Sequence, residues 1–131
     1  MNDTETIKAL TQLKDGKNIN IKTFRKNGEG AATPVWFVED KDFFYICTGG
    51  ATYKVKRIRN NPEVQIAASD ASGNPKGEYF EGKARILEKD EVDTFYSLFR
   101  KKYSGFRMWN FFANLGKKEE KKQVYLEVTL K

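Results

Sequence analysis

Histidine is absent from this sequence, and cysteine occurs once, as Cys47. Without histidine, the chain lacks the usual general base, the usual zinc ligand and the middle member of a Ser-His-Asp or Cys-His arrangement. A single cysteine forms no disulfide within the chain, which fits a reducing compartment, and we expect Cys47 to be a small buried hydrophobe. We therefore expect no metal site. The sequence does not identify a catalytic side chain.

Long hydrophobic runs are also absent. No stretch approaches the roughly 20 apolar residues that a membrane span needs, and the polar start MNDTETIKAL is not typical of a signal peptide. At 131 residues the chain has the size of one domain with a sizeable core. We expect a single cytoplasmic domain over residues 1–131, without a membrane partner.

Basic residues outnumber acidic ones, at 24 Lys and Arg against 18 Asp and Glu, and give a net charge of +6. This balance favours an anionic ligand or a nucleic acid. Single-stranded nucleic acid is the distant alternative, because a basic barrel with interleaved aromatic residues can bind it. Acidic residues interrupt the basic runs, however, and the sequence contains no recognition motif of a DNA- or RNA-binding module.

Alternating residues and turn signals predict a mainly β protein. The six expected strands lie at residues 18–23, 31–38, 43–48, 64–69, 78–87 and 123–131. Helical spacing predicts helices at residues 4–13, 52–59, 90–103 and 106–115. Asn27-Gly28 predicts a hairpin turn, and Pro34 predicts an edge position or a bulge, because proline donates no ladder hydrogen bond. Six antiparallel strands with short hairpins and peripheral helices predict a closed or split β-barrel.

Residues 43–62 carry the strongest functional signal. An apolar strand ends in Thr48-Gly49-Gly50, and a short predicted helix follows. Its four cations are Lys54, Lys56, Arg57 and Arg59. Hydroxyls, backbone N–H groups and cations that meet where a strand leads into a helix can hold a phosphate. The alternative is that these cations form only the solvated face of a short helix.

The chain also carries a family resemblance. The stretches TFRKNGEGAATPVWFV, FFYICTGGATYKVKRIRNNPEVQIAASD, EYFEGKARIL and RKKY follow one another in this order. Together they resemble the pyridoxamine 5′-phosphate oxidase-like split-barrel flavoproteins, and more closely the branch of oxidoreductases that depend on the deazaflavin coenzyme F420. The resemblance runs over residues 17–103 and is most specific at residues 54–62.

The resemblance implies a homodimeric split barrel that binds a flavin-type cofactor at the subunit interface. It places four residues near the cofactor phosphate: Thr48, Thr52, Lys54 and Arg57. Five more would lie along the ring and its linker: Thr23, Arg25, Pro34, Val35 and Trp36. Reduced F420 would transfer hydride to a small electron-poor acceptor. FMN is the alternative cofactor, because the two share a tricyclic ring, a ribityl chain and a phosphate.

The sequence departs from the vitamin B6 oxidases of this family. It has Tyr53-Lys54 where they carry an Arg-Lys pair, and it lacks their substrate-binding histidine. Oxidation of pyridoxamine phosphate is therefore disfavoured. A non-catalytic cofactor carrier remains an alternative to an enzyme, and a proton could come from water, Tyr53 or Tyr103.

Several side chains keep two interpretations at this point. Trp36 serves either barrel packing or contact with the cofactor ring. The aromatic residues Trp109, Phe111 and Phe112 are expected in the core or a dimer interface, or else in a substrate pocket wall. The acidic tail of F420 calls for further cations, and the candidates by composition are Lys26, Lys56, Arg59 and Lys76.

Overall fold

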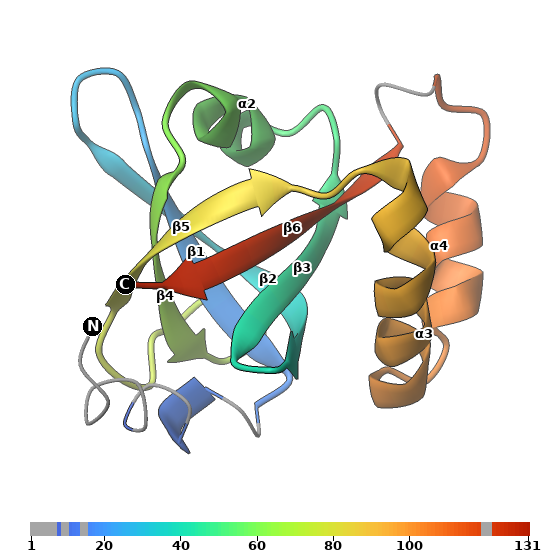
Figure 1. The fold of residues 1–131 in the computed structure, drawn as a ribbon, viewed down its shortest axis with the longest axis horizontal. Coiled ribbons are helices and arrows are strands. Elements are labelled where there is room, and N and C mark those ends of the chain that lie inside the picture. Colours follow the sequence, from blue (N-terminus) through green and yellow to red (C-terminus); the bar gives the residue numbers. More distant parts are fainter. Residues whose placement is uncertain (1–7, 9–10, 14–15, 119–121) are drawn as a thin grey trace.

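The computed structural model describes residues 8, 11–13, 16–118 and 122–131. Six antiparallel strands close a barrel in the order β1-β2-β3-β6-β5-β4 (Figure 1). Their bounds are β1 Asn18–Phe24, β2 Gly30–Asp40, β3 Phe43–Gly49, β4 Glu63–Ser69, β5 Phe80–Ile86 and β6 Gln123–Leu130. The predicted fold, a mainly β barrel of six antiparallel strands, is confirmed.

Helices cover two parts of the barrel surface. The helix α2, Tyr53–Asn60, connects β3 to β4. The short 3₁₀ helix η1, Lys89–Glu91, leads into α3, Val92–Lys102, and α4, Phe106–Asn114, follows it (Figure 1). The predicted helix over residues 4–13 falls mostly outside the described residues. No helix in the described part of the chain is long and apolar enough to cross a membrane.

The element boundaries shift where the local backbone decides them. The sequence predicts one helix over residues 90–103, but its start is a separate 3₁₀ turn whose Glu88 and Glu91 side chains cap each other's backbone. The sequence leaves residues 39–42 between two predicted strands. In the structure the turn consists of Lys41 and Asp42 alone, and both have a positive φ, at 53° and 70°. Two positive-φ residues give the primed turn that matches strand twist, so β2 and β3 extend up to it.

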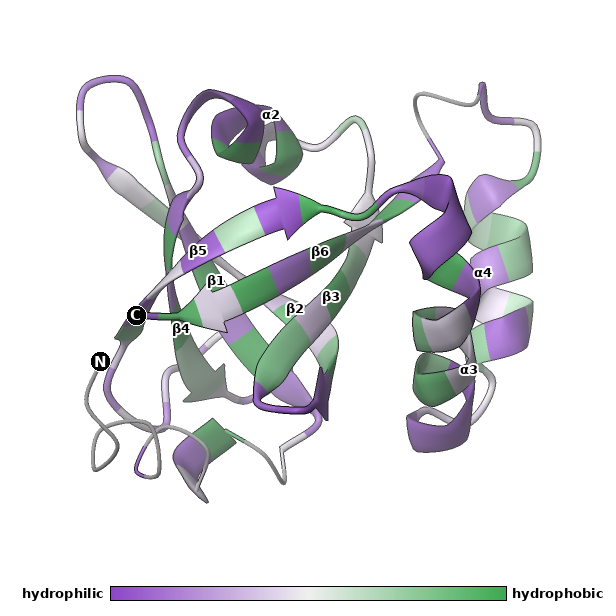
Figure 2. Cartoon of the chain, viewed as in Figure 1, coloured by the Kyte–Doolittle hydropathy of each residue, from purple (hydrophilic) through white to green (hydrophobic). Residues whose placement is uncertain are grey.

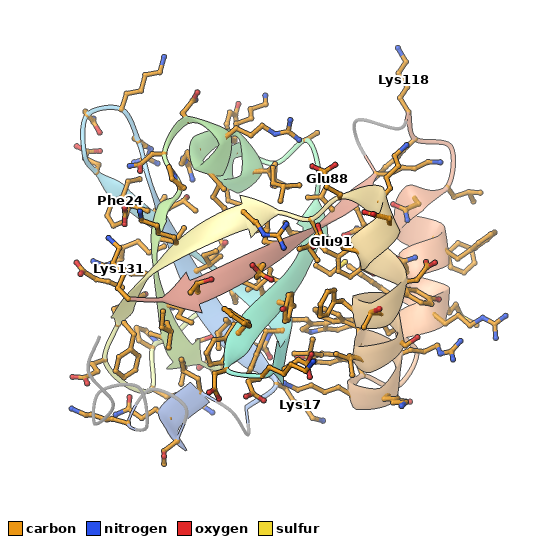
Figure 3. All side chains as sticks on the ribbon, viewed as in Figure 1. Lys17, Phe24, Glu88, Glu91, Lys118 and Lys131 are labelled. Atoms are coloured by element: carbon orange, nitrogen blue, oxygen red, sulfur yellow. The ribbon has the colours of Figure 1, made fainter. Side chains whose placement is uncertain are left out.

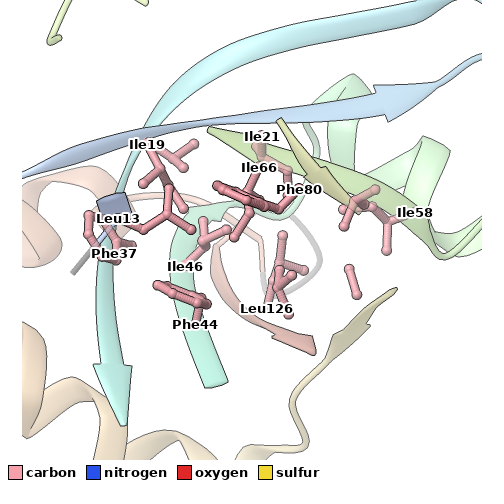
Figure 4. Packing of buried hydrophobic residues seen from close by; sticks show 14 residues of the cluster. Leu13, Ile19, Ile21, Phe37, Phe44, Ile46, Ile58, Ile66, Phe80 and Leu126 are labelled. Atoms are coloured by element: carbon pink, nitrogen blue, oxygen red, sulfur yellow. The ribbon is translucent and has the colours of Figure 1, made fainter. Parts of the chain in front are cut away.

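The barrel interior is an apolar core. Ile19, Ile21, Phe37 and Phe44 are fully buried in it, together with residues from every strand (Figure 4). Hydrophobic and hydrophilic residues alternate along β5 and β6 (Figure 2), as expected when one face of a strand meets the core. The alternation in residues 18–23 therefore predicted correctly which side chains of β1 face inward, except that Asn20 on the other face is also buried.

A second core lies outside the barrel, under α3 and α4. Phe99 and Phe106 are fully buried there and pack with centroids 5.2 Å apart. The Tyr45 ring on β3 stacks on Phe95 at 3.8 Å. This layer buries Trp36 and Val38 of β2, Tyr45 and Cys47 of β3 and Tyr125 of β6, so β3 is apolar on both of its faces.

The ladder between β2 and β3 is incomplete. Only residues 37–40 of β2 pair with residues 43–46 of β3. Residues 30–36 pair with β1 instead, and residues 47–49 pair with β6. Within the described strands, the barrel therefore splits between these two segments. Pro34 lies in the split part of β2, which confirms the predicted edge position.

Tyr103, at the end of α3, holds β2 in place. Its buried hydroxyl lies 2.7 Å from the carbonyl oxygens of both Lys17 and Phe37 and shares its single proton between these two acceptors. It accepts a hydrogen bond from the Phe37 N–H at 2.9 Å. The Lys102 ammonium also donates to the Phe37 carbonyl oxygen, at 2.9 Å. Burial raises the pKa of Tyr103 to about 12, so its hydroxyl stays protonated at neutral pH.

We expect Tyr103→Phe to lower the free energy of unfolding by about 1–3 kcal/mol, because the buried Phe37 N–H and Lys17 carbonyl lose their partner. Urea denaturation measures this change. Tyr53→Phe is the control: the Tyr53 side chain is 73% exposed on α2, so the loss of its hydroxyl should be nearly neutral. Equal losses in the two variants would contradict the proposed role of Tyr103.

Candidate functional site

A cavity of about 370 Å³ opens where β2 and β3 separate. If their register continued, Trp36, Val35 and Pro34 would face Cys47, Thr48 and Gly49. All six residues line the cavity instead. The other lining residues are Asn18, Lys54, Ala71, Trp109 and Gln123. The volume lies within the range of small-molecule sites in proteins.

The open edge of β2 directs backbone groups toward this cavity. Phe37 turns its N–H and C=O toward the β1 side, where they meet Tyr103. Successive residues of a strand point their N–H and C=O groups to opposite edges. The N–H and C=O of Trp36 therefore point to the other edge of β2, toward the opening between β2 and β3. Pro34 faces the same edge, so its missing N–H costs no ladder hydrogen bond there.

Lys54 supplies positive charge to the cavity. Its side chain is half-buried, and no carboxylate of the described residues lies within ion-pair distance of its ammonium. Burial, and then the neighbouring Arg57 guanidinium, lower the pKa of Lys54. A half-buried cation without a counter-ion points to an anionic ligand.

The N-terminus of α2 adds to this charge. Its N-cap residue is Thr52, but the Thr52 hydroxyl donates to the Gly49 carbonyl oxygen at 2.9 Å and leaves the helix uncapped. The first turn of α2 contains no acidic residue. Uncapped N–H groups and the helix dipole favour a negative charge at this end. Lys54 and the helix start can therefore hold one anion together.

Arg57 is positioned by the barrel. Its Nη1 donates to the hydroxyl oxygen of Thr23, at 3.3 Å, and Thr23 is fully buried on β1. The guanidinium also lies 5.9 Å from the centre of the Tyr53 ring. These contacts hold α2 on β1 and keep a second cation beside Lys54.

An aromatic wall closes another side of the cavity. Trp36 points out of the barrel and stacks on Tyr103, with centroids 4.6 Å apart and planes at 8°. Trp109 of α4 packs against Trp36 at 5.2 Å. The neighbouring Phe37 points into the barrel core. Trp36 therefore packs on the outer face of the barrel, in line with the packing interpretation, whereas Phe37 occupies the barrel interior; contact of Trp36 with a cofactor ring remains a prediction.

Cys47 and Gln123 form a neutral part of the lining. The Cys47 thiol donates to Gln123 Oε1 at 3.4 Å, and burial raises its pKa to about 12. The thiol therefore stays protonated at neutral pH and is a poor nucleophile. It behaves as the small buried residue that the sequence predicts.

The structure brings together five of the nine residues predicted to bind a cofactor. The five that line the cavity are Pro34, Val35, Trp36, Thr48 and Lys54. Thr23, Thr52 and Arg57 stand behind them, linked by the hydrogen bonds above. Arg25 lies at the β1–β2 turn, exposed, and pairs with Glu29 at 3.3 Å. A cofactor role for any of the nine remains a prediction.

Sequence reasoning left several lining residues out. A two-residue turn at Asn27-Gly28 would pair Asn18 with Phe37. The actual loop has three residues, 26–28, and this shift by one residue pairs Asn18 with Trp36 at the cavity. Ala71 and Gln123 carry no signal of their own, since a loop and a late strand bring them to the cavity. Trp109 was weighed as a pocket wall, and it lines the cavity at 40% exposure.

The two tyrosines considered as proton donors are not among the cavity-lining residues. Tyr53 is 73% exposed on α2. Tyr103 is buried, and its hydroxyl is committed to the backbone of Lys17 and Phe37. The lining side chains also include no carboxylate. The cavity is thus equipped to bind and orient a ligand, with one cation at one end.

The sequence and the fold were each compared with known proteins. The sequence matches the family described as pyridoxamine 5′-phosphate oxidase over residues 6–130. No curated protein matches the chain.

Solved structures share the fold at low identity. The heme storage protein HutZ of Vibrio cholerae matches with a TM-score of 0.69 and 12% identity, over 98% of this chain and 89% of that one. A structure described as an F420 reductase matches with a TM-score of 0.60 and 20% identity, over 93% and 92%. A pyridoxamine 5′-phosphate oxidase-related, FMN-binding protein of Nostoc punctiforme matches at 0.63 and 13%, over 98% and 79%.

We expect Arg57→Gln to raise the pKa of Lys54 part of the way to its ordinary value. The variant removes the neighbouring positive charge, whereas the burial that also lowers this pKa remains. Nitrogen NMR of the lysine ammonium groups over a pH series measures the change. Lys56→Gln, on the exposed side of α2, is the control with the same loss of charge and should have a smaller effect. An unchanged pKa in Arg57→Gln would show that the two cations do not interact.

Proposed function

The chain belongs to the pyridoxamine 5′-phosphate oxidase family, and we propose that it binds a flavin-type cofactor in the cavity between β2 and β3 and acts as an oxidoreductase. The first choice of cofactor is F420, and FMN is the alternative. The substrate class is a small electron-poor acceptor of hydride.

One observation carries this proposal. The half-buried Lys54, without a carboxylate partner in the described residues, lies beside the uncapped start of α2 at a cavity that Trp36 and Trp109 also line. A cofactor with a phosphate and a flat tricyclic ring fits this pair of features. The phosphate would take Lys54 and the α2 N–H groups, and the ring would lie along residues 34–36.

The structural neighbours support a flavin-type ligand. They include the F420 reductase, the FMN-binding protein and an FAD-binding protein of Mesorhizobium loti, which matches with a TM-score of 0.62 and 15% identity. Heme, which the name of the Vibrio cholerae protein suggests, is less well supported. The sequence has no histidine, so the most common axial ligand of heme iron is missing.

In the proposed mechanism the bound cofactor supplies the hydride chemistry. Lys54 and Arg57 would neutralise the phosphate and fix one end of the cofactor. Trp36, held by its stack on Tyr103, would support the ring. The open backbone edge of β2 at Trp36 would offer hydrogen bonds to the ring. The protein therefore contributes orientation and exclusion of water.

We further propose a homodimer in which a second copy covers the open side of the cavity. The cavity lies at a strand edge whose backbone groups lack a strand partner in the described chain. A second copy would exclude water from the ring. A monomer at micromolar concentration by sedimentation, with cofactor still tightly bound, would rule out this arrangement.

Lys54→Ala tests the site directly. We expect it to weaken FMN and F420 binding by about 1.5–3 kcal/mol, roughly ten- to a hundredfold in Kd, because a charge-assisted hydrogen bond to the phosphate is lost. Fluorescence titration measures the affinity. Lys56→Ala is the matched control on the exposed face of α2, and it should change FMN affinity by less than about twofold. Equal affinities in wild type and Lys54→Ala would remove the site assignment.

Salt dependence separates the two cofactors. The oligoglutamate tail of F420 should meet exposed cations such as Lys56 and Arg59. Its affinity should therefore fall appreciably as the Debye length shrinks from about 10 Å at 0.1 M salt to about 3 Å at 1 M. FMN, held by one partly buried phosphate and its ring, should lose less. Tight, salt-insensitive FMN binding together with negligible F420 binding would make FMN the cofactor.

A further inference from the structure

The helix α4 is apolar on two opposite faces. Its inward face carries Phe106, which is fully buried, and Trp109 at the cavity. Its outward face carries a stripe with the helical spacing i, i+3, i+4 and i+7. The stripe consists of Met108, Phe111, Phe112 and Leu115, which are 67%, 61%, 62% and 61% exposed. A surface helix normally turns its apolar side to the core and its polar side to solvent. The helix α4 stands at the edge of this molecule with a second apolar face outward, although Arg107, Asn110 and Asn114 form a polar side between the two faces (Figure 1).

The stripe is large for a protein surface. Phe, Tyr and Trp side chains bury roughly 150–250 Å² each, so four large side chains at this exposure present on the order of 400–500 Å² of apolar surface. Apolar patches of this size are at the upper end for monomers and are often functional. Of the six large hydrophobic side chains exposed in the described residues, only Tyr53 lies outside α4 and its C-terminal end.

The net charge of the chain is concentrated in the sequence segment that contains this helix. Residues 100–122 contain eight Lys and Arg but only two Glu. This segment therefore carries the whole net charge of +6, and the rest of the sequence is balanced at sixteen residues of each sign. The exposed cations next to the stripe are Arg107, Lys117 and Lys118. Lys118 projects away from the barrel (Figure 3).

Cations and apolar side chains meet in one hollow of the surface. Arg107, Lys117, Phe111 and Leu115 line it, and its volume is about 500 Å³. The positive charge therefore lies beside the stripe, in the arrangement that lets an apolar face enter a lipid boundary while cations stay at the level of the headgroups.

We propose that α4 docks on an anionic lipid bilayer surface. The stripe enters the boundary between headgroups and acyl chains, and Arg107, Lys117 and Lys118 contact lipid phosphates. The nine-residue helix is far too short to span a bilayer, so the contact is peripheral. Trp109, on the inward face of the same helix, stays at the cavity when the stripe docks.

Charge decides between a membrane and a second copy of the chain. Cations flank both ends of α4, with Arg107 near its start and Lys117 and Lys118 after its end. Two copies of α4 paired through the stripe would place cations close to cations in a parallel or an antiparallel arrangement. An anionic bilayer complements the same charges. The homodimer proposed above uses the cavity side of the molecule, so the two proposals stand independently.

Co-sedimentation of the full chain with vesicles tests this proposal. We expect binding to phosphatidylcholine vesicles with about 30% phosphatidylglycerol to be at least about tenfold stronger than to phosphatidylcholine alone, and to weaken with salt. Phe111→Ser with Phe112→Ser should reduce binding at least about tenfold. The control variant with Phe111→Leu and Phe112→Leu keeps the stripe apolar and should bind the vesicles as the wild type does.

Two double variants that reverse charge complete the experiment. Lys117→Glu with Lys118→Glu should abolish the preference for anionic vesicles, whereas Lys26→Glu with Lys76→Glu, the same change at exposed sites off α4, should preserve it. Urea denaturation confirms that each variant is folded. Binding that ignores phosphatidylglycerol, or that survives the serine variant, would overturn the proposal. A third result would also overturn the proposal: the wild type forms an oligomer and does not bind vesicles, and the serine variant is a monomer. That result would assign the stripe to a contact between copies of the chain.

Discussion

The incomplete ladder between β2 and β3 is the feature on which the site depends. Four residue pairs join the strands next to their tight turn. Beyond them β2 pairs only with β1 and β3 pairs only with β6. The six residues that would have continued the ladder become the walls of a cavity. Pro34 fits this arrangement, because a strand edge without a partner needs no N–H from it. The barrel closes through its other strands, so the opening creates a site without breaking the core.

Packing outside the barrel keeps this opening rigid. Tyr103 binds the backbone on both sides of the β1–β2 end and supports Trp36 by stacking. Phe106 anchors α4, which brings Trp109 to the cavity. The two terminal helices are therefore part of the site, although they lie outside the barrel. Changes in α3 or α4 should act on the cavity through Trp36 and Trp109 rather than through the barrel core.

The sequence predicted the strands, the barrel and the edge position of Pro34, because alternation, Asn-Gly turns and proline act locally. It also singled out Lys54 and the start of α2, since a Gly-Gly turn before a basic helix is a short-range signal. It could not predict Ala71 or Gln123 in the cavity, because only tertiary packing brings a loop and the last strand there. Phe111 and Phe112 were expected in the core or an interface. They are exposed because α4 turns the face with Phe106 toward the protein. Periodicity alone does not predict which face is buried when both faces are apolar.

The central claim is that the gap between β2 and β3, with Lys54 at one end, is the cofactor site. A crystal structure of the protein grown with FMN or F420 tests it most directly. We predict the ring between residues 34–36 of β2 and residues 47–49 of β3, and the phosphate within hydrogen-bond distance of the Lys54 ammonium. A cofactor bound elsewhere, such as the hollow lined by Asp70 and Lys76, with the gap left free, would contradict the account.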